Sequence, residues 1–124
     1  MTRILLVEDD REMRVLLARH LRRNGYEVIE AWDGIAALAR LGDAICACGR
    51  SGFDVMVSDV RMPGHSGLEL LHELRRCDWA MPVVLITAFA TNAMHDEAKK
   101  LGAHMLDKPF EFEALTTTLE QLVS

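Results

Sequence analysis

The sequence predicts an α/β protein built on one doubly wound parallel sheet. Short apolar runs alternate five times with longer segments of helical periodicity, a pattern that places helices on both faces of a parallel sheet. The runs are apolar almost throughout rather than at alternate positions, as expected for strands buried on both faces. The 124 residues suffice for one hydrophobic core, so we expect a single domain over residues 1–124.

The first part of the chain contains two predicted strand–helix units. Their strands are residues 3–7 and 27–31. Asn24-Gly25 and Asp33-Gly34 supply stop and turn signals after the first helix and the second strand. A Gly-rich stretch at residues 48–52 is interpreted as a surface loop. The helices are recognised by apolar residues three or four positions apart: Met13, Leu16, Leu17 and Leu21 in the first, and Ile35, Leu38, Leu41 and Ile45 in the second.

The remainder repeats the pattern three times. The predicted strands are residues 54–58, 83–86 and 104–106, the last being short and weakly apolar. Parallel strands joined by helices require right-handed crossovers. The three helices are indicated by Leu68, Leu71 and Leu74 after Gly67, by residues 92–101 before Gly102, and by Leu115, Leu119, Leu122 and Val123.

Composition excludes several classes of function. Apolar runs such as residues 4–7 and 81–86 are too short to cross a bilayer, and the N-terminus does not resemble a signal peptide. Cys46, Cys48 and Cys77 have spacings that suit neither a disulfide framework nor a zinc site. We therefore expect a cytoplasmic protein. The net charge of −5 argues against direct nucleic-acid binding, which needs a basic patch.

Polar side chains stand at the carboxyl ends of four of the predicted strands. Glu8 and Asp9 follow the first strand, Asp59 ends the third, Thr87 ends the fourth and Lys108 follows the fifth. Singly, each residue is most simply a turn, cap or solvated residue. Parallel strands deliver these ends to one edge, where ligands of such sheets bind. Five such side chains at one edge therefore predict a functional site.

The types of residue restrict the chemistry of this site. Three crowded carboxylates repel one another and need protons or a cation. Oxygen ligands suit Mg²⁺, and these motifs contain no His or Cys that would favour zinc or copper. Mg²⁺ usually accompanies a phosphoryl group, and an Asp can act as the nucleophile that accepts it. Thr87 offers a hydroxyl donor and Lys108 a positive charge for the phosphoryl oxygens.

Four motifs together resemble the receiver domains of two-component response regulators. They are Glu8-Asp9-Asp10 after an apolar strand, the segment from Asp59 to Gly67, Thr87-Ala88, and Lys108-Pro109-Phe110. The resemblance covers essentially the whole chain. It implies a flavodoxin-like (βα)5 fold with strand order 2-1-3-4-5. It also implies a signalling domain that catalyses only its own phosphorylation and dephosphorylation, and is otherwise not an enzyme.

The resemblance implies a role for each site residue. Asp59 would accept the phosphoryl group from a phosphohistidine. Asp9 would bind Mg²⁺ directly and Glu8 largely through water, with Asp59 and the backbone carbonyl of Arg61 as further ligands. Thr87 would bond a phosphoryl oxygen and shift on activation, and Lys108 would pair with the phosphoryl group.

The resemblance also implies partners. The phosphoryl donor would be a sensor histidine kinase or a phosphotransfer protein, and the receiver of the signal a downstream output domain or effector protein. Homodimerisation on phosphorylation is a further expectation.

Two features depart from the family pattern. Met105 stands where the family usually has a switch aromatic, and Met is apolar and flexible, so its coupling to Thr87 is expected to differ. The segment between Gly34 and Asp59 is several residues longer than usual, which predicts a longer second helix and a surface insertion. The resemblance further implies that the side chains flanking the approach of water to the phosphoryl group are Arg61 and Phe89, which stand two residues after Asp59 and Thr87. Because neither side chain can act as a base, we expect a long-lived aspartyl phosphate.

Three alternatives compete with a receiver domain. A phosphatase of the haloacid dehalogenase kind also uses an Asp nucleophile and Mg²⁺, but its usual acid/base Asp two residues later is Arg61 here. A flavin- or nucleotide-binding domain would need a Gly-rich first turn, whereas this turn begins with Glu8-Asp9-Asp10. A pseudo-receiver that only binds partners is disfavoured by the complete set of site residues.

Overall fold

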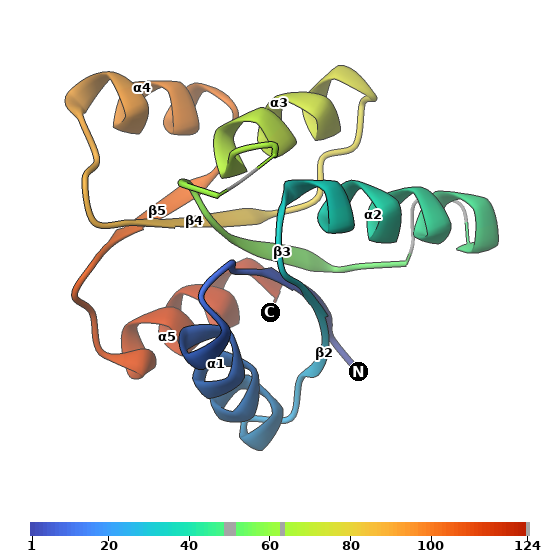
Figure 1. Ribbon diagram of the computed structural model, residues 1–124, viewed down its shortest axis with the longest axis horizontal. Helices are drawn as coiled ribbons and strands as arrows, with labels where there is room; N and C mark the ends of the chain where they lie inside the picture. Colours follow the sequence, from blue (N-terminus) through green and yellow to red (C-terminus); the bar gives the residue numbers. More distant parts are fainter. Residues whose placement is uncertain (49–51, 63, 124) are drawn as a thin grey trace.

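Five strands and five helices alternate along the described part of the chain in a computed structural model (Figure 1). The structure describes residues 1–48, 52–62 and 64–123, with the side chains of 43–48 left out. The elements are β1 (Arg3–Val7), α1 (Arg11–Arg23), β2 (Glu27–Ala31), α2 (Gly34–Cys48), β3 (Val55–Asp59), α3 (Gly67–Arg76), β4 (Val83–Thr87), α4 (Asn92–Lys100), β5 (His104–Asp107) and α5 (Phe112–Val123).

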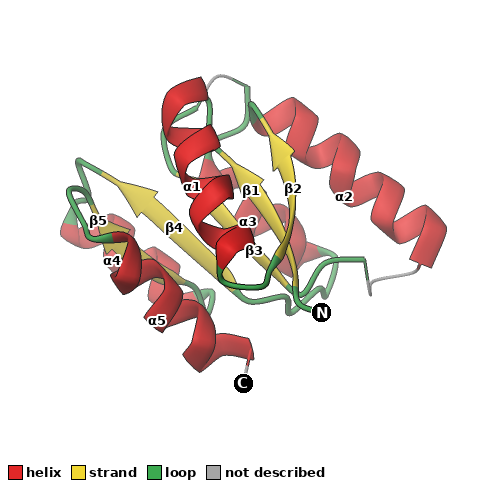
Figure 2. Ribbon diagram, turned by 90° about the horizontal axis from the view of Figure 1, so that it is seen from below, coloured by secondary structure: helices red, strands yellow, loops and turns green. Residues whose placement is uncertain are grey.

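All five strands form one parallel sheet in the order β2-β1-β3-β4-β5, which confirms the predicted fold and strand order. Helices α1 and α5 cover one face, and α2, α3 and α4 cover the other (Figures 1 and 2). The register sets Asp59 beside Ile86 and Thr87 beside Asp107. The carboxyl ends of the central strands therefore lie next to one another at one edge.

Each face of the sheet has its own hydrophobic layer. Along β1, Leu5 and Val7 pack in the layer under α2, α3 and α4, whereas Ile4 and Leu6 pack in the layer under α1 and α5. All four side chains are at most 1% exposed. This two-sided burial explains why residues 4–7 are apolar at consecutive positions rather than at alternate ones.

The predicted strand ends are correct to within one residue. The strands β3, β4 and β5 end at Asp59, Thr87 and Asp107, each one residue later than the apolar runs predict. These polar residues continue the strand because their backbone groups still pair with the neighbouring strand. The site residues are thus the last ones of their strands or follow them directly.

The helices agree with the predictions except in which apolar residues they bury. Leu16 and Ile35 lie at helical spacing with core residues, yet they are 48% and 64% exposed. The second helix does extend to Cys48, as its extra length predicted. The side chains of Ile45, Cys46 and Cys48, and most of the predicted glycine loop, lie outside the described residues. No helix among those described is long and apolar enough to cross a membrane.

Gly67 allows α3 to begin directly beside the end of β3. A Cβ atom at this position would lie 2.4 Å from the backbone oxygen of Asp59, which is closer than any side chain could tolerate. The Gly67 N–H also donates to the carbonyl oxygen of Val60 at 2.9 Å. The loop after Asp59 is therefore folded tightly against the sheet edge.

Candidate functional site

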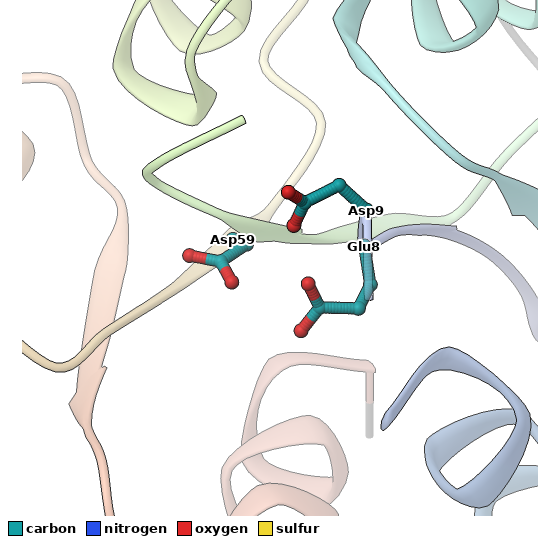
Figure 3. Close-up of side chains that lie close together, drawn as sticks. All are labelled: Glu8, Asp9 and Asp59. Carbon is teal, nitrogen blue, oxygen red and sulfur yellow. The ribbon is translucent and has the colours of Figure 1, made fainter. Parts of the chain in front are cut away.

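Three carboxylates from two strand ends converge at the carboxyl edge of the sheet. Glu8, Asp9 and Asp59 each contribute an oxygen to a group in which all three atoms lie within 4.8 Å of one another. Figure 3 shows the side chains of Glu8 and Asp9 on one side of this group and Asp59 on the other. Glu8 is 2% and Asp59 9% exposed, whereas Asp9 is open to solvent.

The third acid of the first motif has a different task. Asp10 is the N-cap of α1, and its Oδ1 accepts hydrogen bonds from the N–H groups of Glu12 at 3.0 Å and Met13 at 3.3 Å. Such bonds satisfy donors that a helix leaves unpaired at its start. The Asp10 carboxylate is thus engaged at the start of α1 rather than in the cluster of Glu8, Asp9 and Asp59.

Lys108 places one ammonium group among these acids. Its Nζ lies 2.9 Å from Oδ2 of Asp59 and 3.6 Å from Oε1 of Glu8. Its backbone N–H donates to the Thr87 carbonyl at 2.8 Å, which fixes the residue beside β4. Burial alone would lower the pKa of Lys108, but its hydrogen bond to Asp59 and the charges of both acids raise that pKa above the usual value. The side chain therefore stays cationic.

One lysine does not balance three acids. Burial, the charge of Asp59 and a hydrogen bond with Asp9 raise the pKa of Glu8 to about 7, and Lys108 offsets this only in part. A carboxyl group with such a pKa retains a proton near neutral pH unless a further cation replaces that proton. An all-oxygen donor set with excess negative charge fits Mg²⁺.

Thr87 ends β4, the strand beside β3, and Met105 lies on the edge strand β5. Thr87 is 1% exposed, and its Oγ1 accepts a hydrogen bond from the N–H of Phe89 at 3.2 Å. Met105 is half-buried, pairs in register with Leu85, and packs against the core under α4. The Thr87 hydroxyl thus lies at the carboxyl edge of the sheet, and the Met105 side chain lies one strand further from the acids.

Two side chains from different loops stack beside the site. The N–H of Arg61 donates to Oδ1 of Asp59 at 3.2 Å, and its guanidinium carbon lies 5.0 Å from the centre of the Phe89 ring. Phe89 is 66% exposed, so the guanidinium covers one of its faces while the rest of the ring meets solvent. The importance of Arg61 and Phe89 can be predicted from the sequence, but the contact between their side chains cannot.

Arg14 is a site neighbour that the sequence analysis missed. Its Nη1 donates to the backbone oxygen of Glu8 at 3.0 Å. Five arginines lie on α1, and no motif distinguishes Arg14 from the others. Helical spacing does place Arg14 one turn after Asp10, and this is the only signal that could have indicated it.

Acids, a buried threonine and a lysine at the carboxyl edge of a parallel sheet are the groups that a phosphoacceptor signalling domain requires. The family model described as the response regulator receiver domain matches residues 4–120. The chain belongs to this family of two-component signalling domains. It is therefore a signalling domain, as predicted, rather than a phosphatase or a nucleotide-binding domain.

Three known proteins illustrate the relationship. The chain is 37% identical to the transcriptional regulatory protein TctD of Salmonella typhimurium over 98% of its own length, but spans only 51% of TctD. It is 32% identical to the response regulator receiver protein CpdR of Brucella abortus, covering 99% of this chain and 98% of CpdR. The structure of TrrA from Thermotoga maritima in complex with Mg²⁺-BeF is 30% identical, with a TM-score of 0.83, and the match covers 98% of this chain and 99% of TrrA.

Proposed function

We propose that Asp59 accepts a phosphoryl group, and that Glu8, Asp9, Asp59 and the backbone carbonyl of Arg61 hold the Mg²⁺ that this step requires. The position of the Asp59 carboxylate carries the proposal. Oδ1 accepts from the Arg61 N–H at 3.2 Å, and Oδ2 lies 2.9 Å from the Lys108 ammonium. The nucleophile is thus oriented by one donor and paired with the cation that would neutralise an incoming phosphoryl group.

The proposed transfer is balanced in atoms and charge. A carboxylate oxygen of Asp59 attacks phosphorus, the P–N bond of a phosphohistidine breaks, and the electron pair remains on the imidazole of the donor. Bound Mg²⁺ supplies positive charge to the phosphoryl oxygens. Thr87 would donate its hydroxyl hydrogen to one of these oxygens, and Lys108 would pair with another.

Incubation with acetyl phosphate tests this function without a partner protein. With Mg²⁺ present, intact mass spectrometry is expected to show the addition of one phosphoryl group. Removal of the metal with a chelator is expected to stop the addition, because the acid cluster then repels the donor. A chain that gains no phosphoryl group under any Mg²⁺ concentration would instead be a pseudo-receiver.

The raised pKa of Glu8 predicts that Mg²⁺ binding weakens as the pH falls. Glu8 is protonated below about pH 7 in the metal-free protein, so Mg²⁺ must displace that proton, and binding releases it. Between pH 8 and pH 6 we expect about a tenfold loss of Mg²⁺ affinity in calorimetry. Glu8→Gln, which cannot bind this proton, is expected to flatten the pH dependence, and an equally steep profile in that variant would exclude Glu8 as its source.

A protein rather than a small molecule is the proposed physiological donor. Among the described residues, the large apolar side chains with the greatest exposure after Met1 are Phe89, Ile35, Trp32, Leu16 and Val15. They lie on α1, on the loops after β2 and β4, and at the start of α2. These loops leave the sheet at the same edge as the acids, and α1 and α2 begin there, so the exposed apolar side chains are candidates for a protein contact. A sensor kinase or a phosphotransfer protein would use this surface as the phosphoryl donor. An output domain or effector would bind the phosphorylated form. Homodimerisation of the phosphorylated form is a further proposal.

We propose that Thr87 and Met105 form the switch that responds to phosphorylation. A thioether side chain fixes its neighbours less firmly than an aromatic ring, so the unphosphorylated chain should exchange between two arrangements of residues 88–106. Relaxation-dispersion NMR is expected to detect this exchange and to show less of it in Met105→Tyr. Identical, rigid spectra of both proteins would contradict the proposal.

The stacked pair of Arg61 and Phe89 is proposed to prolong the life of the phosphoryl group. Neither side chain can activate water, and the stacked pair would limit the approach of water to the phosphoryl group on Asp59. An exposed cation–π pair is worth ~0.5–1 kcal/mol, so Phe89→Ala should shorten the half-life of phosphorylated protein by about two- to fivefold. Decay in Mg²⁺ after removal of the donor measures this, with Arg61→Asn as the second variant. Unchanged decay in both variants would assign the lifetime to Thr87, Lys108 and the metal alone.

A further inference from the structure

The backbone oxygen of Glu8 is held by a side chain that phosphotransfer itself does not use. Nη1 of Arg14, on α1, donates to this oxygen at 3.0 Å, and Nε of the same guanidinium lies 3.4 Å from Oε1 of Glu30 on β2. We propose that Arg14 is a positioning residue that fixes the first acid loop for Mg²⁺ binding. This role rests on the proposed function, because it concerns the Mg²⁺ ligands named there.

The geometry ties the Glu8 residue to β2 on both sides. Its N–H donates to the Ala31 carbonyl at 3.1 Å, and its own carbonyl accepts from Arg14, which is in turn paired with Glu30, the neighbour of Ala31. The Arg14 side chain is only 15% exposed, so the surrounding residues restrict its own position. With both backbone groups fixed, the direction of the Glu8 side chain and the course of the chain into Asp9 are fixed too.

Charge and position predict opposite effects for this arginine. As a cation near three acids, Arg14 repels Mg²⁺, so a purely electrostatic role means that its removal strengthens Mg²⁺ binding. As a positioning residue it preorganises the ligands, so its removal weakens binding. The sign of the change therefore separates the two roles.

Calorimetric titration of the whole chain with MgCl2 tests the role. Substitution of a residue that orients metal ligands typically lowers the metal affinity by about 10–100-fold. Because water can replace part of the bond to a backbone oxygen, we expect Arg14→Gln to raise the dissociation constant by about tenfold. Arg14→Lys keeps the charge but lacks the two-pronged group that reaches both the Glu8 carbonyl and Glu30, so it is expected to bind Mg²⁺ almost as weakly.

Arg22→Gln is the matched control. Arg22 is on the same helix, and its Nη2 lies 3.3 Å from Oε2 of Glu30 and donates to the Val28 carbonyl at 2.9 Å. Its described contacts are with β2 and none is with the acid loop. The same charge is lost and the same glutamate loses a partner, so a positioning role for Arg14 requires that Arg22→Gln leave the dissociation constant unchanged within about twofold.

A second readout separates positioning from a loss of stability. In acetyl phosphate labelling, Arg14→Gln is expected to require about tenfold more Mg²⁺ for half-maximal rate, while its rate at saturating Mg²⁺ stays near that of the wild type. A merely structural role would lower the melting temperature without moving either Mg²⁺ constant.

Two results overturn the role. If the wild-type chain binds Mg²⁺ and Arg14→Gln binds it equally or more tightly, Arg14 does not position the loop, and the proposed function is untouched. If the wild-type chain itself binds no Mg²⁺, the proposed function fails and this role fails with it.

Discussion

Asp59→Asn is expected to abolish phosphorylation by acetyl phosphate completely, which is the largest effect of any single substitution in the chain. An amide has nearly the shape of the carboxylate, but its oxygen is too weak a nucleophile to attack phosphorus. The hydrogen bond from the Arg61 N–H can still be made to the amide oxygen, which keeps the loop after β3 in place, whereas the amide NH2 cannot accept from Lys108 as Oδ2 does. Intact mass spectrometry of the two proteins gives the answer directly.

Two variants of the first motif serve as controls for Asp59→Asn. Asp10→Asn removes the same charge close by, but Asn caps helices as well as Asp does, so labelling should proceed as in the wild type. Asp9→Asn keeps the acceptor and removes one proposed Mg²⁺ ligand, so labelling should persist but require more metal. Equal labelling of Asp59→Asn and the wild type would move the acceptor to another residue.

The fold follows from the sequence because the three inner strands β1, β3 and β4 are buried on both faces. Residues 4–7 of β1 have helices above and below them, so all four are apolar, and the acids Glu8 and Asp9 can follow only at the carboxyl end. The parallel topology then brings these residues, Asp59 and Lys108 to one edge whatever the lengths of the helices between them. This is why the polar residues of the site could be predicted together.

Contacts between side chains from different loops could not be predicted in this way. Helical spacing identifies a stripe but not what covers it, which is why Leu16 and Ile35 are exposed although they share the spacing of core residues. The stacking of Arg61 on Phe89 depends on how two loops of irregular backbone meet. The raised pKa of Glu8 depends on its burial at the sheet edge, which its place in the motif does not specify.

Replacement of Lys108 by Ala is the second substitution with a large expected effect, and it should act in opposite directions on two measurements. Loss of the ammonium removes the positive charge 2.9 Å from the Asp59 carboxylate oxygen, where the phosphoryl group would be attached. Removal of one such preorganised charge or donor commonly costs about 10²-fold in rate, and we expect a loss of this size in labelling by acetyl phosphate at saturating Mg²⁺.

Mg²⁺ binding should instead become tighter in Lys108→Ala. Lys108 partly neutralises Glu8 and Asp59 in the metal-free protein and repels a divalent cation. Without Lys108, the acids attract Mg²⁺ with no competing positive charge. Calorimetry measures this, with Lys99→Ala as the control because Lys99 is exposed on α4. Weaker Mg²⁺ binding together with slower labelling would show that the lysine mainly keeps the acid cluster folded. Tighter binding with slower labelling would show that its charge acts on the phosphoryl group.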